Sequence, residues 1–76
     1  MKFNLGDIVR GKKDNGYGIT NHEAYMRITG IFPPFEDGEE YEYEVLVLKR
    51  RDTMDFVGET FTVEESALER PSVKLK

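Results

Sequence analysis

Apolar and polar residues alternate along two long stretches of the chain. Over residues 23–32, Ala24, Met26 and Ile28 alternate with more polar positions. Over residues 40–50, every second position of the first part is aromatic or β-branched: Tyr41, Tyr43, Val45 and Val47. Because side chains of a strand point alternately to its two faces, this period of two predicts two strands with one buried face each.

The second face of residues 40–50 changes character along the strand. It begins with Glu40, Glu42 and Glu44 and continues with Leu46 and Leu48. We therefore expect one wet face in the first half of this strand and cover on both faces in the second half. A long strand that bends across a small barrel has this pattern.

Turn residues divide the rest of the chain into short strands. Strands are expected over residues 7–11 and 58–63, with a last short strand within residues 66–70. Gly30 interrupts the alternation and indicates a bulge or a barrel corner. Pairing is expected to stop at Pro33-Pro34, which have no N–H to donate, and Asp37-Gly38 predicts the hairpin turn that follows.

The segment before the last strand carries a helix-start pattern. Thr62-Val63-Glu64-Glu65 fits a capping box, which predicts one helical turn, and Pro71 ends the last strand. A full helix over residues 63–70 is the competing interpretation. About eight residues are too few for a helix that is stable on its own, so the single turn is favoured. The sequence predicts an all-β, five-stranded small barrel.

Composition narrows the class of protein. A chain of 76 residues forms one small domain, expected over residues 1–71, with a frayed tail over 72–76. There is no cysteine, so disulfides and thiolate metal sites are excluded. The longest wholly apolar run, residues 45–48, is too short to cross a membrane, and no signal peptide is recognised at the start. We expect a soluble, cytoplasmic protein.

The negative charge lies in one block. Against a net charge of −4, residues 35–48 hold six acidic and no basic groups, which leaves a net +2 elsewhere. The acidic residues are Glu36, Asp37, Glu39, Glu40, Glu42 and Glu44. They indicate either a solvated hairpin whose charges prevent strand-edge aggregation, or an acidic patch that attracts a basic partner. A third interpretation is a patch that imitates nucleic-acid phosphates in the groove of another protein.

Candidate catalytic groups are few. The single histidine, His22, lies beside Glu23 and cannot form a zinc site without other strong ligands. Ser66 and Ser72 are the only serines that could act as nucleophiles. The many carboxylates lie on a wet strand face, whereas acid–base catalysis needs two groups with contrasting environments. We expect no enzymatic activity, no metal and no cofactor.

The composition favours a binding role, since aromatic residues gather near the loops and dominate many interfaces. The stiff, apolar Pro33-Pro34-Phe35 segment adjoins the acidic block, and Phe35 is the residue expected to be most exposed. The candidates for binding an unidentified protein partner are Tyr17, Tyr25, Pro33, Pro34, Phe35, Glu36, Asp37 and Glu39. The alternative that most of these aromatic residues only close the barrel ends stays open.

A second binding hypothesis uses the basic residues. Lys12, Lys13, Lys49, Arg50 and Arg51 are expected to converge on one face, where tyrosines offer stacking surfaces for nucleic acid. A sequence pI of about 4.9 argues that such binding is weak and steeply dependent on salt.

Several motifs together resemble a known class of small barrels. They are Phe3-x-x-Gly6-Asp7-x-Val9, Tyr17-Gly18-Ile19-Thr20-Asn21, Val57-Gly58-x-x-Phe61-x-Val63 and Ala67-Leu68-Glu69. Over residues 3–70 the chain resembles the Src-homology-3-like small β-barrels of bacterial and phage-encoded proteins. The resemblance implies a five-stranded barrel with a long first loop, a helical turn before the last strand and no catalytic residues to carry over.

The same opening, Gly6-Asp7-x-Val9, also occurs in the KOW barrels of ribosomal and transcription proteins. Their next element, Gly-x-x-Gly-x-Val, is absent here, which argues against RNA binding. The sequence therefore favours a non-enzymatic protein-interaction module, phage- or mobile-element-encoded, acting in the cytoplasm (of the host, if phage-encoded) as a monomer or weak homodimer. Weak nucleic-acid binding is the alternative.

Overall fold

Five strands make up almost all of the regular structure. The computed structural model describes residues 1–12, 24–51 and 54–71. The bounds of the strands given below, and every statement that a feature is absent, refer to these residues. The strands are β1 (Ile8–Gly11), β2 (Ala24–Phe32), β3 (Glu42–Arg50), β4 (Thr60–Glu64) and β5 (Leu68–Glu69). A short 3-10 helix, η1 (Glu65–Ala67), precedes β5.

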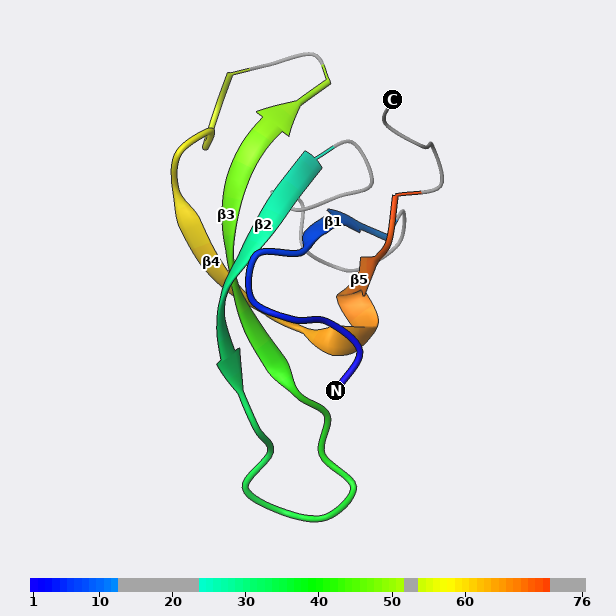
Figure 1. Ribbon diagram of the computed structural model, residues 1–76. Coiled ribbons are helices and arrows are strands. Elements are labelled where there is room, and N and C mark those ends of the chain that lie inside the picture. Colours follow the sequence, from blue (N-terminus) through cyan, green and yellow to red (C-terminus); the bar gives the residue numbers. More distant parts are fainter. Residues whose placement is uncertain (13–23, 52–53, 72–76) are drawn as a thin grey trace.

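All strand pairs are antiparallel, in the order β4-β3-β2-β1-β5. Figure 1 shows this sheet curling into a half-barrel, with the β2–β3 hairpin projecting beyond it. The expected all-β fold with five strands and one helical turn before the last strand is confirmed. β3 and β4 each begin two residues later than the sequence suggested, because Glu40, Tyr41, Gly58 and Glu59 belong to the adjoining loops.

Two bulges bend the central β2–β3 pair. Ile28 pairs with Val45 and Gly30 with Glu44, which leaves Thr29 as an extra residue in β2. The expected irregularity at Gly30 is confirmed, and a Cβ atom at this glycine would lie 3.1 Å from the Cβ of Glu44. A second register shift leaves Leu48 extra in β3, between the Tyr25–Lys49 and Met26–Val47 pairs. Each bulge increases the local twist, which is how a sheet this small curls around a core.

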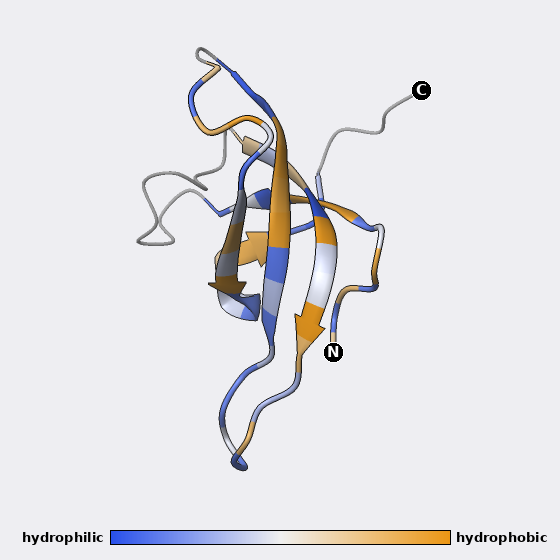
Figure 2. Ribbon diagram, turned by 90° about the vertical axis from the view of Figure 1, so that its left-hand side faces the viewer, coloured by the Kyte–Doolittle hydropathy of each residue, from blue (hydrophilic) through white to orange (hydrophobic). Residues whose placement is uncertain are grey.

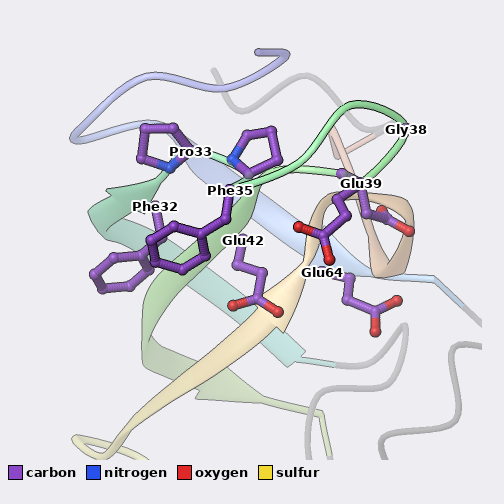
Figure 3. Close-up of a pocket in the computed structure, with 9 residues that line it drawn as sticks. Phe32, Pro33, Phe35, Gly38, Glu39, Glu42 and Glu64 are labelled. Atoms are coloured by element: carbon purple, nitrogen blue, oxygen red, sulfur yellow. The ribbon is translucent and has the colours of Figure 1, made fainter.

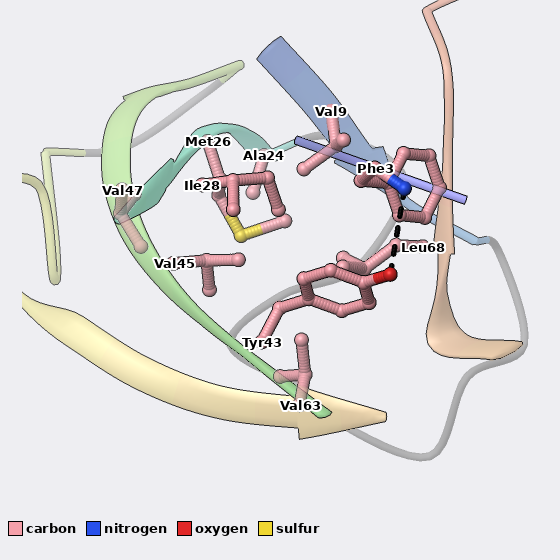
Figure 4. Packing of buried hydrophobic residues seen from close by; sticks show 10 residues of the cluster. All are labelled: Phe3, Val9, Ala24, Met26, Ile28, Tyr43, Val45, Val47, Val63 and Leu68. Carbon is pink, nitrogen blue, oxygen red and sulfur yellow. Dashed lines mark hydrogen bonds between the residues drawn. The ribbon is translucent and has the colours of Figure 1, made fainter. Parts of the chain in front are cut away.

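The core lies on the concave side of the sheet. Its buried residues are Phe3, Val9, Ala24, Met26, Ile28, Tyr43, Val45, Val47, Val63 and Leu68 (Figure 4). The alternating positions of both long strands are thus buried as predicted, and Tyr41 is half-buried against this core.

The second half of β3 departs from the prediction. Leu48 is 37% exposed and Leu46 is half-buried, so this half is not covered on both faces. The bulge explains the difference, because the extra residue Leu48 leaves the ladder at the point where cover was expected. Figure 2 shows the hydrophobic (orange) far half of β3 and the hydrophilic (blue) half beside the hairpin.

The capping-box prediction is wrong in its residues. Thr62 lies inside β4, and the N-cap of η1 is Glu64, whose side chain makes no capping hydrogen bond. Glu40 from the hairpin takes this role instead. Its Oε1 accepts the Ser66 backbone N–H at 2.7 Å, and its Oε2 accepts the Ser66 hydroxyl at 3.1 Å. A carboxylate distant in sequence therefore satisfies the free amide of the turn.

The entry to β1 follows the expected turn chemistry. Gly6 has a φ of +86°, and the Asp7 Oδ2 accepts the Asn4 backbone N–H at 2.9 Å. Gly6 donates to the Ile28 carbonyl at 2.8 Å, and Ile28 donates to the Asp7 carbonyl at 2.9 Å. These bonds extend the β1–β2 pairing toward the N-terminus. The predicted first loop, His22 and the tail 72–76 lie outside the described residues.

Candidate interaction surface at the β2–β3 hairpin

An open groove lies where the β2–β3 hairpin leaves the sheet. It encloses about 830 Å³, within the ~300–1,000 Å³ range common for ligand sites. Aromatic, proline and acidic residues from the hairpin, β3 and β4 surround it: Phe32, Pro33, Pro34, Phe35, Gly38, Glu39, Glu40, Glu42 and Glu64 (Figure 3). We call this set the hairpin groove.

The conformation of the hairpin loop is determined by residues within the loop. Pro33 and Pro34 end β2, and Gly38 adopts a φ of +90° in the turn that was predicted at Asp37-Gly38. The Glu39 backbone donates to the Glu36 carbonyl at 3.3 Å, while the Glu36 backbone donates to Glu39 Oε1 at 3.2 Å. These bonds close the turn locally, and residues 35–40 are exposed to solvent.

Two phenylalanine rings are exposed at the groove. Phe35 is 100% exposed, which confirms its expected exposure, and Phe32 is 46% exposed. Neither ring closes the barrel, because both lie outside the buried cluster. Exposed large apolar rings gathered with prolines are characteristic of binding surfaces.

The acidic block separates into carboxylates with internal partners and carboxylates without them. Glu40 binds Ser66, and Glu44 Oε1 accepts the Thr29 hydroxyl at 2.9 Å. Glu42 lies directly opposite Glu64 in the β3–β4 register, with Phe32 opposite Glu42 on the other side. Within the described part of the chain, no cation forms an ion pair with either Glu42 or Glu64. Like charges directly opposite each other destabilise a sheet.

Five groove residues were not among the binding candidates predicted from the sequence: Phe32, Gly38, Glu40, Glu42 and Glu64. Of these, Glu64 is the most distant in the sequence. It lies twenty positions after Glu44, the last residue of the acidic block, and only the strand register brings it beside Glu42. The structure gathers the predicted residues Pro33, Pro34, Phe35 and Glu39 at the groove, and Glu36 and Asp37 lie in its turn. Tyr25 lies at the opposite end of β2, and Tyr17 lies outside the described residues.

The basic candidates were expected to share one face, but Lys49 and Arg50 lie on opposite faces of the sheet. Lys49 pairs with Tyr25 and Arg50 with Ala24, so neighbouring side chains of β3 point to opposite sides of the sheet. The Arg50 guanidinium lies 5.7 Å from the Phe56 ring centre and donates to the Asp55 carbonyl at 3.4 Å. Lys12 continues from β1 and donates its backbone N–H to Ala67 at 2.9 Å. Arg51 follows β3, and Lys13 lies outside the described residues.

A second polar cluster lies near the N-terminus and serves packing. The Tyr43 hydroxyl donates to Glu65 Oε2 at 2.5 Å, and the Lys2 backbone N–H donates to the same oxygen at 2.9 Å. Burial and then the hydrogen bond to Glu65 raise the pKa of Tyr43. Burial opposes ionisation of Glu65, but the hydrogen bonds from Tyr43 and Lys2, together with the positive charges of the N-terminus and Lys2, outweigh it and lower the pKa of Glu65.

The remaining chemistry of the described residues is limited. No group of three or more potential metal ligands occurs among residues 1–12, 24–51 and 54–71. No helix in this part of the chain is long and apolar enough to span a membrane. No protein-family model matches the chain, and no curated protein or solved structure is significantly similar to it.

Proposed function

We propose that this protein is a non-enzymatic interaction module that binds a basic segment of a partner protein at the hairpin groove. The observation that carries this proposal is the Glu42–Glu64 pair. Two carboxylates face each other across neighbouring strands, beside exposed aromatic rings and without an internal cation among the described residues.

The groove offers two kinds of contact to an arginine or lysine side chain. A cation beside Glu42 and Glu64 relieves the repulsion between them, and an arginine can form paired hydrogen bonds with a carboxylate. The ring of Phe35, fully exposed, offers a face for cation–π contact or for an aliphatic stem. The repulsion between Glu42 and Glu64 destabilises the free protein, and a bound cation relieves it. Binding of a basic side chain is therefore favoured.

Binding fits these groups better than catalysis. General acid–base chemistry needs two groups whose surroundings separate their pKa values. The groove carboxylates Glu39, Glu42 and Glu64 are all exposed to solvent. The proposed setting is the bacterial or host cytoplasm, on the strength of the resemblance to bacterial and phage-encoded barrels and the absence of cysteine.

The test is a selection of random peptides on the immobilised protein. We expect enriched peptides to contain arginine or lysine beside apolar residues, and enrichment to weaken with added salt. Phe35→Ser and the double variant Glu42→Gln, Glu64→Gln should each lose the enrichment. Glu59→Gln, which removes one negative charge away from the groove, should keep it.

Two outcomes would contradict the proposal. One is enrichment of peptides without basic residues, and the other is equal enrichment on the groove variants and on wild type. The nucleic-acid alternative is tested separately by titrating single-stranded DNA at low salt. Backbone amide shifts at Lys12, Lys49, Arg50 and Arg51 would support that alternative, and unmoved shifts would remove it.

A further inference from the structure

We infer that the partner segment binds as an added β-strand along the open edge of β4, with a basic residue opposite Glu64. This inference rests on the proposed function and adds the binding mode to it. The groove supplies the charge at one end of this edge, since Glu64 belongs both to β4 and to the groove lining.

β4 is an edge strand of the sheet. It pairs with β3 on one side, and among the described residues no strand pairs with its other side (Figure 1). The opposite edge of the sheet, β5, is only two residues long. An extended peptide therefore finds the longer template at β4, where five residues offer a ladder of about 17 Å at ~3.3–3.4 Å per residue.

The hydrogen-bond pattern shows which groups of β4 face this open edge. Glu65 donates its N–H to Tyr41 at one end of the pairing, and Val47 donates to Glu59 at the other, both at 2.9 Å. Bonded and non-bonded pairs alternate in antiparallel strands, so Val63 and Phe61 use their backbone groups toward β3. The N–H and C=O groups of Thr60, Thr62 and Glu64 consequently point away from β3, toward the open edge.

The side chains of the same three residues favour strand addition. Thr60, Thr62 and Glu64 are exposed on the convex face, while Val63 is buried beneath the sheet. Natural edges are commonly protected by charged side chains, proline or a bulge, and β4 contains neither a proline nor a bulge. Its one charged residue, Glu64, disfavours an acidic or identical partner strand but attracts a basic one. Threonine also favours strands, so the edge is suited to pairing.

One row of side chains that crosses the strands is negatively charged, and this charge favours a basic partner strand. The row runs from Phe32 through Glu42 to Glu64, and an added strand places its own residue next to Glu64. A lysine or arginine at this position places a positive charge beside the carboxylates of Glu42 and Glu64. A second copy of this chain does not do so: an antiparallel β4 pair centred on Thr62 sets Glu64 opposite Thr60 of the copy, and an in-register parallel pair sets Glu64 beside Glu64.

The experiment uses the full chain and the capped hexapeptide Ser-Val-Arg-Val-Thr-Val. Three matched peptides accompany it: one with Glu in place of Arg, one N-methylated at Arg and Thr, and one N-methylated at the two Val residues that flank Arg. When Arg pairs with Glu64, the N–H groups of Arg and Thr face β4 and those of the Val residues face away. Binding is followed by backbone amide NMR shifts and by amide hydrogen exchange.

We expect the parent and the Val-methylated peptides to bind alike, with protected amides at Thr62 and Glu64, which Thr and Arg of the peptide face, and with shifted amides along β4. The Glu peptide and the peptide methylated at Arg and Thr should each bind about tenfold more weakly, because they lose the charge contact or the ladder. Glu64→Lys should reverse the preference between the Arg and Glu peptides. This charge reversal lies on an exposed side chain, so the fold is expected to persist.

Other results would overturn strand addition. Equal binding of the peptide methylated at Arg and Thr, with shifts confined to Phe32, Phe35 and Glu42, would leave the groove as a site for basic segments that do not form a strand. No binding of the parent peptide, while library selection still enriches basic peptides, would have the same meaning. A doubled mass by sedimentation with protected β4 amides and no peptide would show that a second copy occupies the edge.

Discussion

The Tyr43 hydroxyl donates a 2.5 Å hydrogen bond to Glu65 Oε2 and so links the start of β3 to the turn before β5. The ring of Tyr43 is fully buried and packs edge-on against Phe3, with the ring centres 5.4 Å apart. The same hydroxyl accepts the backbone N–H groups of Lys2 and Phe3 at 3.2 and 3.4 Å. Figure 4 shows the contact with Phe3. One side chain thus joins the N-terminal segment, the sheet and η1.

Tyr43→Phe tests this link. It keeps the buried ring but removes the hydroxyl, which leaves the Phe3 amide without its partner and takes one hydrogen bond each from the Lys2 amide and the Glu65 carboxylate. We expect the free energy of unfolding to fall by about 1.5–3 kcal/mol, the range for hydrogen bonds to charged groups. Urea denaturation measures the change. Tyr41→Phe, at a half-buried ring, is the control and should change stability little; equal losses in both variants would contradict the assignment.

The same cluster gives a pH dependence with a defined sign. The pKa of Glu65 is lower in the folded protein than its ordinary value of 4.5, so its ionised form stabilises the fold above that pH. This contribution is lost as the pH falls through the lowered pKa. We expect Glu65→Gln to be less stable than wild type near neutral pH and the difference to shrink in acid. A constant difference across an acid titration followed by urea unfolding would refute the linkage.

At alkaline pH the linkage runs through Tyr43. The pKa of this phenol is raised above its ordinary value of 10.0, so the stability it contributes is fully present below that pH. It is lost as the pH rises through the raised pKa. Ultraviolet titration of the tyrosinate band should show one late-ionising phenol in wild type, and Tyr43→Phe should lack it.

Glu40→Ala tests whether a distant carboxylate caps η1. The variant loses both contacts with Ser66, and we expect a destabilisation of about 1 kcal/mol, as for the loss of a helix cap. Asp37→Ala removes the same charge from the same loop and should be close to neutral. The comparison is made by thermal or urea unfolding. If the two variants lose equal stability, general charge and not capping accounts for the effect.

Glu64→Gln tests the repulsion across β3 and β4. Removing one of two facing carboxylates should raise the free energy of unfolding by about 0.2–1 kcal/mol at low salt. The gain should diminish as sodium chloride is added, because salt screens exposed charges. Glu59→Gln, with Val47 opposite it, is the matched control. A gain of equal size in the control would attribute the effect to net charge alone.

Much of the fold follows from local patterns in the sequence. The alternation around Met26 and Val45 predicted the buried faces, because a pleated strand sends every second side chain to the same side. Gly30 indicated a bulge, where a Cβ atom would crowd Glu44, and Asp37-Gly38 indicated a turn, where Gly38 adopts a positive φ. The bulge at Leu48 gave no such signal, because an apolar residue does not reveal where a ladder slips.

The candidate site was predicted only in its contiguous part. Pro33, Pro34 and Phe35 lie side by side in the sequence, and a stiff apolar segment beside acidic residues is visible without a structure. Glu64 and the free edge of β4 were not predicted. Both depend on which strands become neighbours and in which register, and these are properties of long-range pairing that no local pattern encodes.

The sequence by itself determined that the chain forms short strands with one apolar face, and that its negative charge is concentrated at one hairpin. The tertiary structure decided what those charges do. The strand register places Glu42 directly opposite Glu64. The fold of the hairpin brings Glu40 into hydrogen-bonding contact with Ser66 and leaves Phe35 exposed to solvent. Equivalent carboxylates thus become a helix cap or an unneutralised pair, because the energy of a charge depends on its neighbours in space.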